Sequence, residues 1–135
     1  MEVKRGSVVS RLLESVEIPP MFRARQTFPR ETILPEDLPA RVTEELSREP
    51  FASKVKPGGS VAVTAGSRGI ANVAVITRAV VDFVKSRGAV PFVVPAMGSH
   101  GGATAQGQLE VLAGYGITPQ TMGCEIRSSM EVVKL

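Results

Sequence analysis

Two apolar segments, each followed by a glycine-rich loop and then by a helix-forming stretch, constrain the fold of this 135-residue chain more than any other feature. The first predicted strand covers 61–64 and the second covers 90–95. The segment between them, from about 70 to 87, is apolar nearly all round. Strands that alternate with helices are typical of a parallel sheet with right-handed crossovers. We therefore predict an α/β fold, a Rossmann-like three-layer domain with a mainly parallel sheet.

The rest of the chain carries weaker signals, which we assign to the same domain. The predicted elements outside the core are a helix over 4–18, a strand over 21–28, a helix near Pro39, a helix over 105–115 capped by Thr104, and a half-buried strand over 124–132. We expect a single domain over 1–135, with the N-terminal strand and helices in 1–56 and the core in 60–135. Because the chain ends on an apolar strand with no covering helix after it, we expect a fragment of a larger two-domain protein.

Composition excludes several classes of function. The net charge is +3, basic and acidic residues are interspersed, and the aromatic residues are five Phe and one Tyr, which does not favour nucleic-acid binding. A single Cys rules out an internal disulfide, and one His with one Cys cannot complete a four-ligand zinc site. No apolar run reaches the roughly 18 residues of a membrane span, and no signal peptide is evident. We expect a cytoplasmic protein with no nucleic-acid or membrane partner and no metal ligands of its own.

The loop after the first strand reads Gly66-Ser67-Arg68-Gly69. Glycines allow an anion to approach the backbone closely, and Ser67 adds a hydroxyl donor. The Arg68 guanidinium can donate two parallel hydrogen bonds to the same anion. A helix that follows directly would also present its free N–H groups to the anion. The alternative is an ordinary helix entry with a surface arginine.

The loop after the second strand carries the only histidine, His100, among the glycines of 97–102. An imidazole near neutral pKa suits general acid–base chemistry, and the flanking glycines give a substrate room. A purely structural histidine is the alternative. In a parallel sheet this loop and the Arg68 loop emerge at the same carboxyl edge, where ligands bind.

The first loop also resembles the Thr-Gly-x-x-x-Gly-x-Gly loop of short-chain dehydrogenases at Thr64, Gly66 and Gly69. Those enzymes need a Tyr-x-x-x-Lys pair, but Pro119 stands four residues after Tyr115, the only tyrosine. Dinucleotide binding is therefore the weakest of the predicted functions.

The segments GSRGIAN, PAMGSHGGAT and GYGIT, at this spacing, resemble the amino-terminal domain of the nickel-pincer-dependent lactate racemase family. The resemblance implies that Arg68 holds the substrate carboxylate and that His100 is an acid–base residue. It also implies that Ser67, with Gly66 and Gly69, faces the phosphate of the cofactor. Ala65 and the Gly101-Gly102 pair depart from the family pattern and indicate a divergent paralogue.

By this resemblance, the full-length protein is a racemase or epimerase that acts on a small 2-hydroxy acid by hydride and proton transfer. Its cofactor would be the nickel-pincer nucleotide, and this chain alone would supply only the N-terminal half-site, without activity and without bound cofactor. The alternative is a non-catalytic module that binds an anion at residues 66–69 or assembles with another subunit. Self-association through a surface exposed by truncation is also expected.

Overall fold

A computed structural model describes residues 6–17, 19–28 and 32–132 of the chain. The chain divides into two units, Met1–Glu31 and Thr32–Leu135, which are described separately below. Among the described residues, no helix is long and apolar enough to cross a lipid bilayer.

The described residues of the first unit form one short helix, α1 (Val8–Leu13), which is shorter than predicted. The Ser7 hydroxyl caps it by accepting a hydrogen bond from the Ser10 amide at 3.2 Å, but the helix buries no residue. Residues 4, 5 and 18 of the predicted helix lie outside the described part of the chain. The strand predicted over 21–28 is wrong, because this segment has no strand structure and every residue in it is exposed. Alternating side chains favour a strand only where a neighbouring strand supplies hydrogen bonds, and no described strand pairs with this segment.

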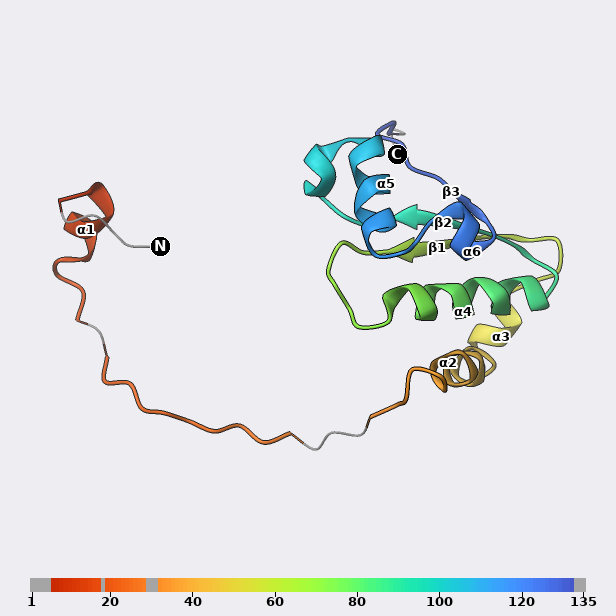
Figure 1. The fold of residues 1–135 in the computed structure, drawn as a ribbon, viewed down its shortest axis with the longest axis horizontal. Coiled ribbons are helices and arrows are strands. Elements are labelled where there is room, and N and C mark those ends of the chain that lie inside the picture. The colour runs from red at the N-terminus through yellow and green to blue at the C-terminus, as the bar shows by residue number, and fades with distance from the viewer. Residues whose placement is uncertain (1–5, 18, 29–31, 133–135) are drawn as a thin grey trace. The chain divides into compact units, whose positions relative to one another are not determined.

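The second unit is built on a three-stranded parallel sheet in the order β1-β2-β3 (Figure 1). Strand β1 (Ser60–Ala65) pairs along its whole length with β2 (Val90–Pro95). Strand β3 (Glu125–Ile126) pairs with Phe92 and Val93 of β2. This mixed helix and strand structure with an open, all-parallel sheet confirms the coarser prediction of an α/β fold.

The helices follow the predicted order, with three additions. They are α2 (Leu38–Leu46), α3 (Phe51–Lys54), α4 (Val73–Ser86), the 3₁₀ helix η1 (His100–Ala103), α5 (Ala105–Gly114) and α6 (Pro119–Met122). Helices α3, η1 and α6 have four residues each and were not predicted. The predicted cap of α5 is confirmed, because the Thr104 hydroxyl accepts a hydrogen bond from the Gly107 amide at 3.1 Å.

The hydrophobic core lies on one face of the sheet. Ala65 and Val93 project from β1 and β2 into a buried cluster with Val81 of α4 and Leu112 of α5. On the opposite face, Ala62 and Thr64 are exposed and Phe92 is covered by the Arg127 guanidinium, whose carbon lies 4.1 Å from the ring centroid. In the part of the chain that the structure describes, α4 and α5 therefore cover the same face, as two crossovers of the same hand require for strands in this order.

The strand predicted over 124–132 is wrong beyond its first residues, since β3 ends at Ile126. One further ladder bond runs from the Arg127 amide to the Val93 carbonyl at 2.8 Å. Pro95, at the end of β2, has no N–H group with which to continue the ladder. The alternating pattern therefore continues in the sequence beyond the residues that can pair with β2.

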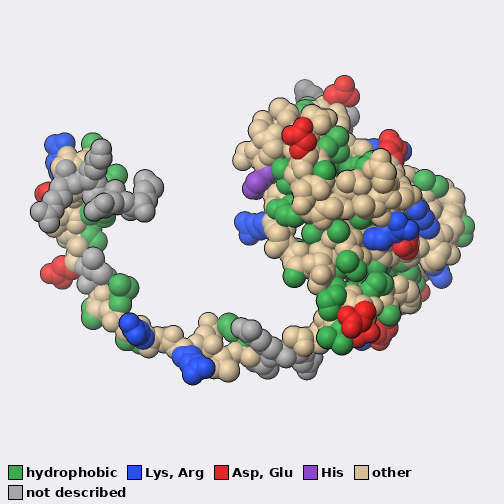
Figure 2. Space-filling view, viewed as in Figure 1, with side chains coloured by type: hydrophobic (Ala, Val, Ile, Leu, Met, Phe, Trp, Pro, Cys, Tyr) green, Lys and Arg blue, Asp and Glu red, His purple; other side chains and the backbone are tan. Residues whose placement is uncertain are grey.

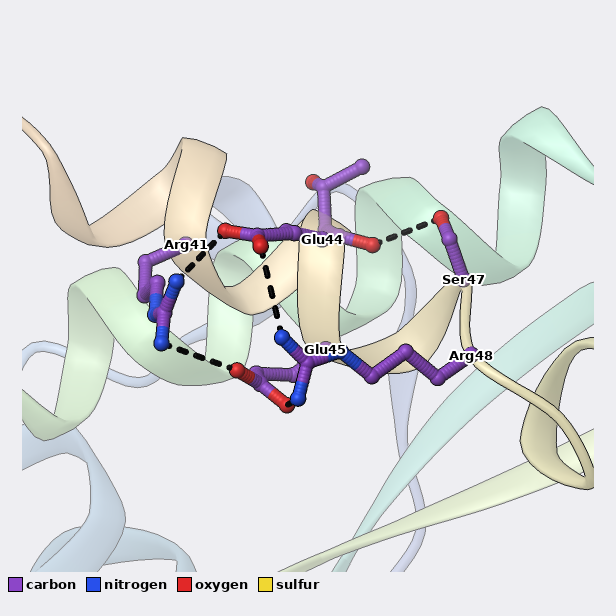
Figure 3. Close-up of polar contacts among 6 residues, drawn as sticks. Arg41, Glu44, Glu45, Ser47 and Arg48 are labelled. Carbon is purple, nitrogen blue, oxygen red and sulfur yellow. Dashed lines mark hydrogen bonds and ion pairs between the residues drawn. The ribbon is translucent and has the colours of Figure 1, made fainter.

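Helix α2 packs against α4 and carries a network of ion pairs on its solvent face (Figure 3). Arg41 contacts Glu44 at 2.7 Å and Glu45 at 3.2 Å, while Arg48 contacts the same two carboxylates at 3.3 and 2.8 Å. All four side chains are about half exposed, so the network contributes helix stability that salt screens.

Candidate functional site

The two predicted loops meet at the carboxyl edge of the sheet. Ser67 follows β1, His100 follows β2, and the Ser67 hydroxyl lies 3.0 Å from Nδ1 of His100, within hydrogen-bond distance. The two residues are 33 positions apart in the chain, so the parallel pairing of β1 with β2 is what brings them together. The prediction that both loops emerge side by side is confirmed.

The backbone of the first loop is held by Tyr115, which follows α5. Its phenolic hydroxyl donates a hydrogen bond of 2.7 Å to the Ser67 carbonyl. Its ring also lies 3.7 Å from where a Cβ atom on Gly69 would stand. No local sequence pattern predicts this contact, since the sequence around Tyr115 indicates only that the Tyr-x-x-x-Lys pair of a dehydrogenase is absent there.

The first loop does not open directly onto a helix N-terminus, contrary to prediction. Helix α4 begins at Val73 after Asn72, which is in the left-handed region with φ 60°, and residues 70–72 separate the helix from Gly69. Because the influence of a helix terminus falls off within one turn, the loop has less support for an anion than the sequence implied. Arg68 is exposed and forms no ion pair or side-chain hydrogen bond with any described residue.

The second loop turns sharply at Gly101 and Gly102, with φ of 65° and 67°. This left-handed backbone suits glycine, and it folds the loop back onto the first turn of α5. A Cβ atom on Gly101 would overlap the backbone of Gly107. The pair therefore serves the fold of the loop that carries His100, in addition to any role in leaving space for a ligand.

Gln108 is a buried polar residue that the sequence analysis missed. Its side chain is 5% exposed, and its Nε2 group donates to the carbonyl oxygens of Met97 at 3.3 Å and Gly98 at 3.1 Å. These hydrogen bonds anchor the backbone of the loop between β2 and His100 to helix α5. The available signal was a polar residue four positions before the apolar Leu112, on the face of α5 that meets the core.

Two loop glycines, Gly66 and Gly98, have no such structural reason to lack a side chain. A Cβ atom on either would meet no atom within 4 Å, and neither has a positive φ. Each follows the carboxyl end of its strand, so open space lies next to the backbone in both of the loops that carry Ser67 and His100.

The first loop carries one charged side chain, the exposed Arg68, and the second loop carries His100. On the face shown in Figure 2, acidic and basic side chains are scattered and the single histidine is at the surface. A hollow of about 510 Å³ lies near the ends of β2 and β3 and is lined by Gln108 and Arg127, but not by Ser67 or His100. Within the described ranges, no three His, Cys, Asp or Glu residues are grouped so as to hold a metal ion.

No protein-family model, curated protein or solved structure matches this chain.

Proposed function

We propose that this chain is the N-terminal half-site of a nickel-pincer-dependent racemase or epimerase that acts on a small 2-hydroxy acid. The observation that carries the proposal is the contact of Ser67 with His100, because it brings the loop with the proposed carboxylate ligand beside the loop with the proposed acid–base residue. In this reading, the Arg68 guanidinium binds the carboxylate through two parallel hydrogen bonds. His100 takes the proton of the 2-hydroxyl group and later returns it.

The residues present fit the phosphate of the proposed cofactor, and no three described His, Cys, Asp or Glu residues are grouped so as to hold its nickel ion. Gly66 leaves its backbone open to an anion, and the exposed Arg68 adds positive charge beside it. When bound, the nickel-pincer nucleotide supplies the hydride acceptor. The Ser67 hydroxyl already contacts His100, so its contact with a phosphate would be shared with the imidazole.

The finer fold assignment belongs to the same proposal. A Rossmann-like three-layer domain needs helices on both faces of the sheet, and the exposed Ala62 and Thr64 leave one face available for such a layer. We assign this layer to a further part of a longer, two-domain polypeptide. Without it, the open face is where self-association would occur.

The proposal is tested by following the imidazole signals of His100 by NMR while lactate is added to the chain. The signals should move with lactate and move less with propionate, which has the carboxylate but not the hydroxyl group. Arg68→Ala should abolish the response. Arg68→Lys should weaken it, because lysine keeps the positive charge but cannot donate two parallel hydrogen bonds to the carboxylate. Arg23→Ala, which removes an exposed arginine of the first unit, is the control and should leave the response unchanged. A response that persists in Arg68→Ala would contradict the proposal.

A second test uses a polypeptide that contains this chain together with the rest of the protein and the nickel cofactor. Racemisation should be lost in both His100→Ala and Arg68→Ala. Gly66→Ala and Gly98→Ala should leave the free energy of unfolding within about 0.5 kcal/mol of the parent, since neither added methyl group meets another atom. Both should nevertheless weaken substrate or cofactor binding, because the methyl group enters the space proposed for the ligand.

The alternative function is a non-catalytic anion-binding or assembly module. It is favoured by one observation, that the hollow beside β2 and β3 does not include Ser67 or His100. A module of this kind would bind phosphate or a carboxylate equally well in His100→Ala and in the parent chain. If the chain is a racemase half-site, the His100→Ala variant should no longer bind lactate in preference to propionate.

A further inference from the structure

We propose that Ser67 and Tyr115 are positioning residues that reserve the Nε2 atom of His100 for proton exchange with a ligand. This inference rests on the proposed role of His100 as an acid–base residue. The family resemblance implies that Ser67 faces the cofactor phosphate, and Tyr115 holds the backbone of the first loop. The structure connects both of them to the imidazole.

The first step is the contact at Nδ1. His100 is exposed, so packing does not fix its ring, and the hydrogen bond with the Ser67 hydroxyl at 3.0 Å is what orients it. An imidazole has two nitrogen atoms, and the partner of one decides what the other can do. With Nδ1 engaged by Ser67, Nε2 is the nitrogen left to face a ligand.

The second step is the anchoring of Ser67 itself. Tyr115 donates to the backbone carbonyl of Ser67 at 2.7 Å, not to its hydroxyl group, so the hydroxyl stays available for His100. The Tyr115 ring is half buried and packs against the core cluster, so it is held more firmly than the loop that it contacts. A rigid side chain after α5 thus fixes the backbone of a loop that would otherwise depend on exposed residues.

The third step is the direction of the hydrogen bond. For Nε2 to accept a proton, Nδ1 must already carry one and donate it in the bond to the Ser67 oxygen. The O–H bond of the ligand then breaks, its electron pair stays on the ligand oxygen, and its proton binds Nε2. The imidazolium keeps the same hydrogen bond to Ser67. The Ser67 hydroxyl therefore accepts in both protonation states, and the ring does not have to turn during the transfer.

The experiment measures the tautomer of His100 in the 135-residue chain by long-range ¹H–¹⁵N NMR at a pH where the ring is neutral. The chain has one histidine, so the imidazole signals need no assignment. In the parent chain, the ratio of the Nδ1–H to the Nε2–H form should exceed that in Ser67→Ala by roughly 2- to 12-fold, the change that one net hydrogen bond produces. Ser67→Thr, which keeps the hydroxyl, should restore the parent ratio.

Tyr115→Phe should lower the same ratio part of the way, because the loop loses its anchor while the Ser67 hydroxyl remains. Ser99→Ala is the matched control, since Ser99 precedes His100 but makes no side-chain capping bond to η1, and it should leave the ratio unchanged. The amide spectrum of each variant reports whether the fold is kept. If Ser67→Ala does not fold, the tautomer ratio of Tyr115→Phe compared with that of the parent chain tests the inference.

Equal tautomer ratios in the parent, Ser67→Ala and Tyr115→Phe would overturn the inference, and so would a parent chain in which the Nε2–H form dominates. The measurement needs no ligand or cofactor. A parent chain with the expected tautomer but no response to lactate would leave the positioning role standing and would contradict the proposed function alone.

Discussion

Gly101 and Gly107 lie in such close backbone contact that neither position has room for a side chain. A Cβ atom on Gly107 would overlap the carbonyl group of Gly101, and it would stand 2.9 Å from the Thr104 hydroxyl. The contact joins the turn after His100 to the first turn of α5. It makes the position of the candidate acid–base loop depend on a helix that carries no proposed catalytic group.

We expect Gly107→Ala to lower the free energy of unfolding by about 1–3 kcal/mol, as overpacking against fixed backbone does. The substitution should also shift the His100 NMR signals, because the turn must move to make room. Thermal or urea unfolding and the imidazole spectrum measure the two effects.

Gly114→Ala is the matched control on the same helix. A Cβ atom there meets nothing within 4 Å, and alanine favours helical backbone over glycine, so this variant should be unchanged or more stable by up to about 1 kcal/mol. Equal effects of the two substitutions would contradict the close contact of Gly101 with Gly107.

Gln108→Leu should lower the free energy of unfolding by about 1–3 kcal/mol, because it leaves the carbonyl groups of Met97 and Gly98 without their buried hydrogen-bond donor. Gln106→Leu tests the same chemical change two residues earlier, where the side chain is exposed and donates a hydrogen bond to the exposed Glu110. This second variant should lie within about 0.5 kcal/mol of the parent. Urea unfolding of both variants makes the comparison, and a costly Gln106→Leu or a neutral Gln108→Leu would refute it.

Burial raises the pKa of the Cys124 thiol, and the nearby Lys85 opposes this only in part. The thiolate is the reactive form, so iodoacetamide should alkylate Cys124 more slowly in the folded chain than in urea-unfolded chain at the same mildly alkaline pH. Because the pKa of the thiol is lower in the unfolded chain than in the folded chain, the free energy of unfolding should also fall as the pH rises above the unfolded pKa. Equal alkylation rates in the two states would contradict the shift.

A hydrogen bond and the charge of Arg41, with a smaller contribution from Arg48, lower the pKa of the Glu44 carboxyl. The folded chain therefore holds fewer protons than the unfolded chain in the acidic range. The resulting stability is present above the unfolded pKa of this carboxyl and is lost as the pH falls through its lower, folded pKa. Glu44→Gln should flatten this part of the curve of stability against pH, and added salt should do the same in the parent. An unchanged curve in low salt would show that the network adds no stability to α2.

Local patterns were enough to predict the central elements. The strand over 90–95 and the cap at Thr104 depend on side chains close together in the sequence, and the structure confirms both. The order of strand, helix and strand also implied that the loops of Ser67 and His100 share an edge of the sheet, as they do. In contrast, the strand predicted over 21–28 depends on a partner that its own alternation cannot report.

The sequence by itself determined the apolar segments, the turns between them and the placement of Arg68 and His100 after two parallel strands, because these follow from periodicity and from the backbone preferences of glycine and proline. Only the tertiary structure decided that the core lies on one face, that β3 ends at Ile126, and that Tyr115 and Gln108 support the two loops. Each of these features depends on contacts between residues distant in the chain. Such contacts are made by single side chains, so periodicity can mark the residue, as it does for Gln108, but does not identify the partner that it contacts.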